Sequence, residues 1–374
     1  MKQGWEIKKL GEVCDILDSQ RKPVTKKDRK EGQYPYYGAT GIQDYVDSYI
    51  FDGRYLLLGE DGAKWGAMDK SAFIIEGKSW VNNHAHILKV HDCLIDTFAE
   101  YYLVFKDLDE YITGAIVRKL TQQALRDIPM LVPPIAEQEK IVAELDCLSG
   151  IIEKKKQQLK ELDNLAQSIF YEMFGDPVEN DKGWNVFALS KNVKVKGRVG
   201  WKGYKKEDLR DSGPLAIGGG HLTDSGGVDL SSPVFLSMEK YLESPEIMVE
   251  VGDIILVQRG TIGKVGLIAN DIGMATINPC VLILRPENLN SIYLLHYFLN
   301  ESIQTHLKTL IKGVAQPMIT QQQVNGLLLP MPPLYLQQDF ASKIESIEKQ
   351  KELIAQSIKE TETLFNSRMD YYFN

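Results

Sequence analysis

The chain has 374 residues, which is too long for one ordinary hydrophobic core and suits two domains with additional elements. Hydrophobic residues make up 44% and charged residues 25%, so the composition excludes a largely disordered chain. The net charge of −8 argues against a generally basic nucleic-acid binder, and no long segment is basic overall. Any affinity for nucleic acid must therefore come from local clusters of basic residues.

No apolar run reaches the roughly 18–20 residues that a membrane span needs, and the first residues lack the apolar segment of a signal peptide. We therefore expect a cytoplasmic location. The four cysteines lie far apart and form no Cys-x-x-Cys pair. Free thiols are expected, rather than a disulfide framework or a zinc site.

Residues 1–133 predict a mixed α/β domain that is rich in strands. Apolar runs such as 55–58 and 85–90 predict strands, and the glycine-rich stretch 38–41 predicts a turn between strands. Aromatic residues spaced along one face predict a helix near 97–106.

A cluster of basic residues at 21–30 is the first candidate for DNA contact. It holds six basic residues and one acidic residue, and duplex binding requires such charges near the phosphates. A charge run is also typical of a solvated loop, so this alternative stays open. The predicted contacts are Arg21, Lys22, Lys26, Lys27 and Arg29, together with Lys64 on a later glycine-rich loop.

Asn82, Asn83 and His84 precede a predicted strand and are candidates for reading bases. Asparagine can form two hydrogen bonds with adenine, and a residue on a turn can project into a groove. A capped turn and a satisfied core histidine are the alternatives. His84 and His86 would share one face of the strand, but a third ligand is not evident, so we expect no zinc site.

Residues 134–174 follow two consecutive prolines and predict a long helix. Apolar residues recur from Ile141 to Met173 with alternating spacings of four and three, and Lys155 is the one break in the seam. A heptad pattern sustained over more than four heptads is typical of a coiled coil.

After a linker at 175–183 the whole pattern repeats. Residues 319–324 match residues 120–125 at an offset of 199, which also aligns the two pairs of consecutive prolines. Near the start of each copy, Trp184 matches Trp5 at an offset of 179. The second copy is therefore about 20 residues longer internally, and the long period indicates two copies of one domain instead of a solenoid.

The second copy, residues 175–332, contains its own candidates for DNA contact. Residues 191–206 hold seven basic residues and no acidic one, at the place of the first cluster. Arg259 precedes a glycine after a predicted strand, and arginine is the commonest partner of guanine. Asn278 aligns with the stretch that begins at Asn82. The predicted contacts in this copy are Lys194, Lys196, Arg198, Lys202, Tyr204, Lys205, His221, Gln258, Arg259, Thr261, Lys264 and Asn278.

Residues 333–374 predict a second long helix. Its heptad seam has the same length as the first, with Lys351, Thr361 and Arg368 as breaks. Two narrow seams of equal length favour mutual pairing, and packing of each helix on its own domain is the alternative. The expected fold class is α+β, with two duplicated mixed α/β domains that are each followed by a long helix.

Motifs for catalysis are missing. Both proline pairs lack the preceding Asn or Asp and the following aromatic residue of an amino-methyltransferase loop. Asp69, Glu76 and Lys78 could fit a metal-dependent nuclease, but nothing like them recurs in the second copy. No phosphate-binding Gly-x-x-x-x-Gly-Lys-Ser/Thr loop occurs. We expect no enzyme. A methyltransferase or nuclease in its own right, and a coiled-coil scaffold that binds only proteins, remain alternatives.

Several stretches resemble the specificity subunits of type I restriction-modification systems. In the first copy they are residues 5–13, 37–41, 57–62, 81–84 and 133–138, and in the second they are residues 258–263, 320–322 and 332–338. The resemblance covers essentially the whole chain, and the duplicated layout is its most specific part.

The resemblance implies a non-catalytic reader of DNA. Residues 1–133 and 175–332 would be target-recognition domains, each for one half of a bipartite, asymmetric double-stranded target. Residues 134–174 and 333–374 would pair as an antiparallel coiled coil. Two methyltransferase subunits, which carry S-adenosylmethionine, and motor-endonuclease subunits, which use ATP, would be the partners. This chain would itself bind no cofactor and no metal.

Overall fold

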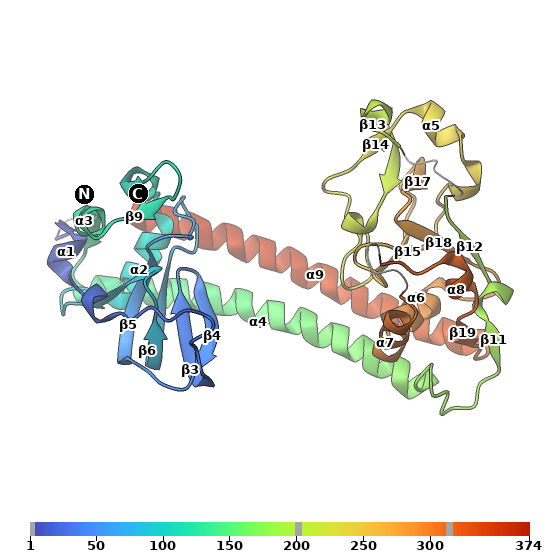
Figure 1. The fold of residues 1–374 in the computed structure, drawn as a ribbon, viewed down its shortest axis with the longest axis horizontal. Coiled ribbons are helices and arrows are strands. Elements are labelled where there is room, and N and C mark those ends of the chain that lie inside the picture. Colours follow the sequence, from blue (N-terminus) through green and yellow to red (C-terminus); the bar gives the residue numbers. More distant parts are fainter. Residues whose placement is uncertain (1–3, 199–203, 312–316) are drawn as a thin grey trace. The chain divides into compact units, whose positions relative to one another are not determined.

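The computed structural model describes residues 4–198, 204–311 and 317–374. Within this part of the chain, no helix is both long and apolar enough to cross a membrane. The chain forms two compact units, Met1–Lys156 with Gln356–Asn374 (unit 1) and Gln157–Ala355 (unit 2). Each unit includes part of α4 (Ile135–Phe174) and part of α9 (Leu334–Phe373), two helices of 40 residues each (Figure 1).

Unit 1 is built on a six-stranded sheet with the strand order β2-β7-β5-β6-β3-β4. β3 and β6 run parallel, and the other neighbours are antiparallel. The strands are β1 (Glu6–Lys9), β2 (Cys14–Ile16), β3 (Glu31–Gly38), β4 (Gly41–Val46), β5 (Phe51–Gly59), β6 (Ala72–Val81), β7 (Ala85–Val90), β8 (Ile112–Thr113), β9 (Lys119–Leu120) and β10 (Pro129–Val132). The short helices are α1 (Leu10–Val13), α2 (Asp96–Phe105) and α3 (Gln122–Asp127).

Unit 2 repeats this strand order. The strands β12-β18-β15-β16 form one sheet and β14-β13-β17 another, and β13 and β17 run parallel. The strands are β11 (Val186–Ala188), β12 (Val193–Lys196), β13 (Leu209–Ile217), β14 (Phe235–Leu236), β15 (Ile254–Val257), β16 (Val265–Leu267), β17 (Ala275–Ile277), β18 (Val281–Pro286) and β19 (Leu328–Pro330). The helices are α5 (Met238–Leu242), α6 (Ser291–Leu299), α7 (Glu301–Thr309) and α8 (Gln321–Asn325). β16 and β17 together stand where the single long β6 stands in unit 1.

Both faces of the central strands are buried, which explains their continuous apolar sequences. In β5, Leu56 and Leu58 pack in one hydrophobic cluster, and Leu57 packs in another. In β15, Ile254 and Leu256 likewise face one cluster, and the intervening residues face another. Alternate side chains of a strand point to opposite faces, so each central strand contributes to two cores.

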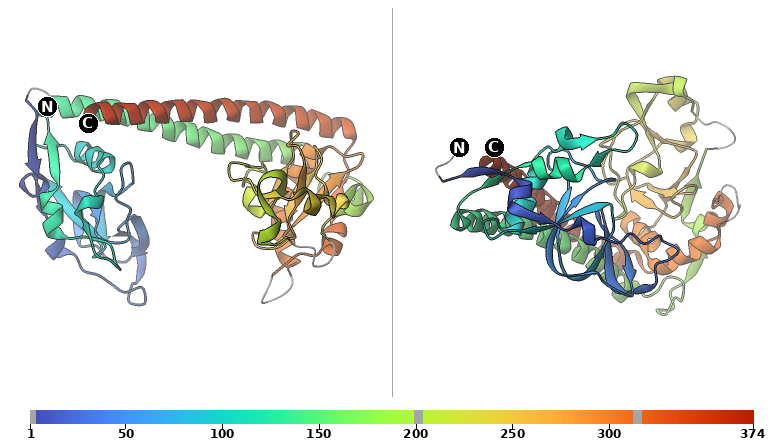
Figure 2. Two further views of the ribbon diagram at one scale, coloured as in Figure 1. Left: turned by 90° about the horizontal axis from the view of Figure 1, so that it is seen from above. Right: turned by 60° about the vertical axis from the view of Figure 1, so that its left-hand side comes forward.

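The predicted long helices are present, and within each unit their segments pair in antiparallel directions. In unit 1, Glu144 contacts Arg368 and Lys155 contacts Ser357. In unit 2, Lys351 of α9 pairs with Asp163 of α4, and Phe340 packs against Phe170. The paired segments lie side by side in Figure 1 and in the left view of Figure 2.

The polar breaks in the two seams are contacts between the helices. Lys155 donates to Thr361 Oγ1 at 3.2 Å, Lys351 pairs with Asp163 at 2.8 Å, and Arg368 donates to Glu144 at 2.5 Å. The alternative, in which each helix packs alone on its own domain, is therefore wrong. The predicted fold class is confirmed, whereas the division into domains at 133/134, 174/175 and 332/333 stays a prediction.

Candidate nucleic-acid interface

In unit 1, backbone hydrogen bonds gather three loops and the β8–β9 hairpin. The amide of Asn82 donates to the carbonyl of Tyr37 at 3.0 Å, which joins the turn after β6 to the end of β3. The amide of Glu60 donates to the carbonyl of His84 at 2.8 Å, and the amide of Leu120 donates to the carbonyl of Glu60 at 2.8 Å. We call this set of backbone contacts the loop framework.

The predicted base-reading residues of unit 1 lie on the loop framework, but they differ in exposure. Asn82 is buried; its Nδ2 donates to Gln43 Oε1 at 3.1 Å, and its Oδ1 accepts from the amide of His84 at 2.8 Å. Asn82 therefore caps the turn, as the alternative proposed. Asn83 and His84 are exposed, and His84 Nδ1 is hydrogen-bonded to Asp61.

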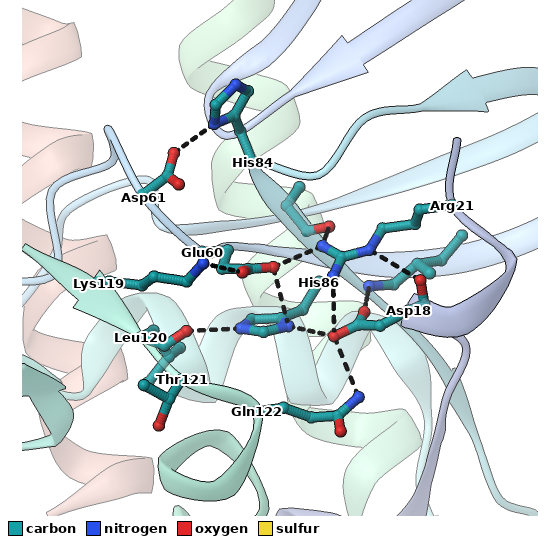
Figure 3. A network of polar contacts seen from close by, with 12 residues as sticks. Asp18, Arg21, Glu60, Asp61, His84, His86, Lys119, Leu120, Thr121 and Gln122 are labelled. Atoms are coloured by element: carbon teal, nitrogen blue, oxygen red, sulfur yellow. Dashed lines mark hydrogen bonds and ion pairs between the residues drawn. The ribbon is translucent and has the colours of Figure 1, made fainter. Parts of the chain in front are cut away.

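A buried charged network lies directly beneath this framework (Figure 3). Arg21 Nη1 donates to Glu60 at 2.6 Å and to the carbonyl of Ala85 at 2.6 Å, and Arg21 Nη2 pairs with Asp18 at 3.2 Å. Lys119 Nζ pairs with the other oxygen of Glu60 at 2.6 Å. The guanidinium of Arg21 is thus paired inside unit 1, and its contact with a phosphate stays a prediction.

His86 completes the network. Its Nδ1 is hydrogen-bonded to Asp18 at 2.6 Å and its Nε2 to the carbonyl of Leu120 at 2.8 Å. Each ring nitrogen thus has a partner inside unit 1. Burial alone would raise the pKa of Asp18, but His86 and Arg21 lower it below its ordinary value.

The pKa of Glu60 is lowered in the same way. Burial opposes its ionisation, and hydrogen bonds from Lys119 and Arg21 outweigh that effect. Asp18, Glu60 and His86 bring one potential ligand atom each within 4.8 Å of one another, which is close enough to hold a metal ion. Because Arg21 and Lys119 already neutralise the carboxylates, these residues suit an ion-pair network better than a metal site.

The basic loop of unit 1 exposes all four of its lysines. Lys22, Lys26, Lys27 and Lys30 are exposed, and the loop is held to the sheet because Trp80 Nε1 donates to the carbonyl of Lys22 at 2.6 Å. Arg29 instead lies over the ring of Tyr36, 4.0 Å from its centroid, and pairs with Asp44 at 3.1 Å. Lys64 is exposed on the loop after β5.

Unit 2 has the same loop framework. The amide of Asn278 donates to the carbonyl of Ile217 at 2.8 Å, and the amide of Gln258 donates to the carbonyl of Cys280 at 2.9 Å. The amide of Ile319 donates to the carbonyl of Gln258 at 3.1 Å. Asn278 caps its turn as Asn82 does, by accepting from the amide of Cys280 at 2.9 Å.

Several predicted residues of unit 2 meet at this framework. Arg259 is exposed, and its Nη2 contacts Met318 Sδ at 3.7 Å. Gln258 Nε2 donates to the carbonyl of Pro279 at 3.0 Å. His221 Nδ1 accepts from the amide of Gly218 at 3.0 Å, so this histidine closes its own turn.

Arg198 and Tyr204 are half-buried next to the turn that contains Asn278. Arg198 Nε donates to the carbonyl of Ile277 at 3.0 Å. Burial lowers the pKa of Arg198, and burial raises the pKa of Tyr204, although a hydrogen bond with Asn278 opposes that rise. Both side chains therefore support the framework from below.

The remaining predicted residues of unit 2 lie further from the framework or are paired. Lys194 and Lys205 are exposed and pair with Glu287 and Glu207, respectively. Lys264 pairs with Asp224 at 2.9 Å. The other members of the predicted set are Lys196, which is half-buried, Thr261, which is exposed, and Lys202, which lies outside the described residues.

The repeated sequence motifs turn out to anchor helices. Thr121 and Thr320 cap α3 and α8 with their side chains. The buried Gln138 and Gln337, each at the start of a long helix, donate to the carbonyls of Pro133 and Pro332 at 2.8 Å. Gln138 also accepts from the amide of Ile95 and donates to the carbonyl of Cys93, so it ties the start of α4 to the connection between β7 and α2.

Sequence reasoning missed Glu60, Asp61 and Lys119 as parts of the candidate site. An available signal was the repeat itself, because Asp61 and Arg259 each precede a glycine in the loop after the equivalent strand. An acidic residue at the place of an arginine is a difference that alignment of the two halves would have highlighted.

A model of a known protein family matches most of the chain. The model of the type I restriction modification DNA specificity domain matches residues 2–164 and 222–363. The chain belongs to this family. Members of the specificity family recognise the DNA target within type I restriction-modification complexes and are non-catalytic components of them. The prediction that this chain is no enzyme is confirmed, and neither alternative function receives support.

Relatives in the specificity family match along almost the whole chain. A putative type I restriction enzyme specificity subunit of Haemophilus influenzae is 27% identical over 98% of this chain and 94% of its own length. The MjaVIII specificity subunit of Methanocaldococcus jannaschii is 22% identical over 96% of this chain and 91% of its own.

Solved structures show the same fold. The S subunit of a type I restriction-modification system from M. genitalium has a TM-score of 0.56 at 13% identity and covers 99% of this chain and 97% of its own. A chain from a study of complex assembly and conformational transition of the type I R-M system has a TM-score of 0.56 at 16% identity, with coverage of 100% and 98%.

Proposed function

We propose that this chain recognises a bipartite, asymmetric target in double-stranded DNA, with one half read by the loops of each unit. The observation that carries the proposal is the loop framework, which occurs twice with the same backbone hydrogen bonds and different side chains. Sequence is read by side chains at base edges. One framework with two sets of side chains therefore supports two different half-sites.

The contacts divide into those that hold the phosphates and those that read bases. Exposed lysines neutralise phosphates without reading sequence: Lys22, Lys26, Lys27, Lys64 and Lys205. Side chains on the framework read bases: Asn83, His84, Gln258 and Arg259, with the exposed Thr261 on the same loop as Arg259. Seven half-buried or buried members of the predicted set position the loops: Arg21, Arg29, Asn82, Arg198, Tyr204, His221 and Asn278.

Each copy of the duplicated sequence supplies one target-recognition domain and one helix of the coiled coil. Residues 1–133 and 175–332 are the two target-recognition domains, and residues 134–174 and 333–374 form the coiled coil that receives the partner subunits. Two methyltransferase subunits bring S-adenosylmethionine, and motor-endonuclease subunits bring ATP. The complex meets its DNA in the cytoplasm.

Methylation mapping tests this function. The chain is co-expressed with its methyltransferase subunits, and modified bases are located in the host DNA by single-molecule sequencing. DNA from a host with the methyltransferase subunits alone is the control. We expect a motif of two different halves with a fixed spacer. No methylation beyond the control, or one uninterrupted motif, would contradict the proposal.

A further inference from the structure

Asp61 in unit 1 and Arg259 in unit 2 occupy the same position in the loop framework. Asp61 follows Glu60, whose carbonyl accepts from the amide of Leu120, and Arg259 follows Gln258, whose carbonyl accepts from the amide of Ile319. Each of the two residues also forms an isolated backbone bridge. Asp61 bridges to Lys119, and Arg259 bridges to Met318. The two units therefore present opposite charges at one equivalent point.

His84 and Cys280 are the second equivalent pair. The carbonyl of His84 accepts from the amide of Asp61 at 3.4 Å, and the carbonyl of Cys280 accepts from the amide of Arg259 at 3.2 Å. Unit 1 thus has the imidazole of His84 on the turn and the carboxylate of Asp61 next to it. Unit 2 has the short side chain of Cys280 on the turn and the long side chain of Arg259 next to it.

The side chains of Asp61 and His84 are hydrogen-bonded to each other. Asp61 accepts from Nδ1, so Nδ1 carries hydrogen and Nε2 is the opposite ring atom. The Asp61 side chain is 19% exposed and the His84 side chain is 47% exposed. Within the described part of the chain, no hydrogen bond to His84 Nε2 is formed, and Figure 3 shows the pair apart from the buried network around Glu60.

We propose that Asp61 is a positioning residue that orients His84 so that its Nε2 atom contacts a base edge in the first half-site. Arg259 reads the equivalent position of the second half-site. The inference rests on the proposed function and names the atoms that read one position of each half-site. Arg259 offers a planar fork that fits guanine O6 and N7, whereas His84 offers a single nitrogen.

The two readers differ in one chemical property. A guanidinium donates hydrogen bonds at every pH that a protein tolerates. The Nε2 atom of a neutral imidazole accepts, which suits the amino group of adenine or cytosine, and that of a protonated imidazole donates, which suits guanine. Asp61 is the charged group in contact with the ring, and Glu60 and Lys119, on the neighbouring residues of the framework, are paired with each other.

The test uses the full chain in complex with its methyltransferase subunits. Methylation rates are measured on duplexes that carry the mapped target with single base-pair replacements. We expect His84→Ala to reduce discrimination about 5- to 100-fold at one position of one half-site. Asp61→Ala should act at that same position, and Asp61→Asn, whose oxygen still accepts from Nδ1, should retain part of the discrimination. Arg259→Ala is the matched variant for the other half-site.

Two results would overturn the inference: Asp61→Ala and His84→Ala acting at different positions, or His84→Ala leaving every preference unchanged. A uniform loss over both half-sites would also refute it, because that is the signature of a structural role. If the unsubstituted complex shows no two-part preference, the proposed function itself fails, and this outcome is recognisable before any variant is made.

Discussion

Lys155 of α4 donates a hydrogen bond from Nζ to Ser357 Oγ of α9 at 2.5 Å, and this contact lies at the only polar interruption of the first heptad seam. Thr361, a break in the second seam, is the other partner of the same ammonium group at 3.2 Å. A polar residue at a core position of a coiled coil selects one register, because other registers leave it buried without a partner. The polar residues that interrupt the seams therefore help to select the register in which α4 and α9 pair.

Replacing Lys155 with alanine should destabilise the chain modestly. The variant loses the hydrogen bonds to Ser357 and the packing of the lysine stem, which together contribute about 0.5–1.5 kcal/mol. Lys154→Ala is the matched control because Lys154 is exposed on the neighbouring position, and it should change the free energy of unfolding by less than about 0.5 kcal/mol. Urea unfolding measures both; equal effects would mean that Lys155 has no special role.

Phe340→Ala should destabilise unit 2 strongly. Phe340 is fully buried and packs against Phe170 and Phe174 of α4, with ring centroids 5.6 and 5.3 Å away. Truncating a buried phenylalanine costs about 3–5 kcal/mol of unfolding free energy. Tyr335→Ala, at a side chain that is 68% exposed on the same helix, is the control and should be nearly neutral. A loss below about 1 kcal/mol for Phe340→Ala would contradict the helix packing described here.

The network around Asp18 predicts a loss of stability in acid. The pKa values of Asp18 and Glu60 in the folded chain lie below their ordinary values of 3.8 and 4.5. At a pH between the lowered pKa of the folded chain and the ordinary pKa, the unfolded chain binds more protons than the folded chain does. The free energy of unfolding therefore falls as the pH falls. The contribution is complete above about pH 5 and disappears as the pH drops through the lowered values.

Asp18→Asn tests this pH dependence. The variant should be less stable than the natural chain at pH 6, and the difference in unfolding free energy should shrink as the pH falls below 3.8, because the unfolded chain then binds a proton at Asp18. Asp52→Asn, at an exposed position, is the control and should show no such trend. A difference that stays constant from pH 6 to pH 3 would disprove ionisation of Asp18 within the network.

Replacement of Gln258 and Arg259 should weaken recognition of one half-site only. Replacing both with alanine removes the predicted guanine contact, and a contact of this kind discriminates by about 1–3 kcal/mol. Methylome mapping of the variant complex should show relaxed preference in one half of the motif and an unchanged other half. The exposed Asn83 of unit 1, replaced with alanine, serves as the reciprocal variant. Equal losses in both halves from either variant would indicate a folding defect or a shared site.

The heptad seams predict that helix length sets the spacer between the half-sites. One added heptad after residue 156 in α4 and one after residue 355 in α9 would face each other in the antiparallel pairing and preserve both seams. Seven residues at 1.5 Å each add about 10 Å, which corresponds to about three base pairs. Methylome mapping of the double insertion measures the spacer.

An active double-insertion variant that keeps the original spacer would show that the linker at 175–183 sets the separation instead. The insertion in α4 alone is the control. It breaks the register, because residues beyond the insertion lose their partners on α9, and it should lower stability without giving a new spacer.

The sequence by itself determined the duplication, the fold class and the long helices. Repeats such as residues 120–125 and 319–324, and a seam that runs from Ile141 to Met173, are local or periodic patterns, and such patterns are visible without coordinates. The two proline pairs marked the helix starts to within about two residues, because a proline is tolerated only in the first turn. Family resemblance rested on these same features.

Only the tertiary structure decided which polar residues are enclosed in ion pairs and which are exposed. Arg21 and Lys22 are neighbours in one basic run, yet the first is enclosed by Asp18 and Glu60 and the second is exposed. Glu60 lies far from Arg21 in sequence, so composition could not foretell the pairing. Asp61 and Arg259 became equivalent only when backbone hydrogen bonds placed them at one point of the loop framework, because loop geometry depends on long-range contacts that no local pattern encodes.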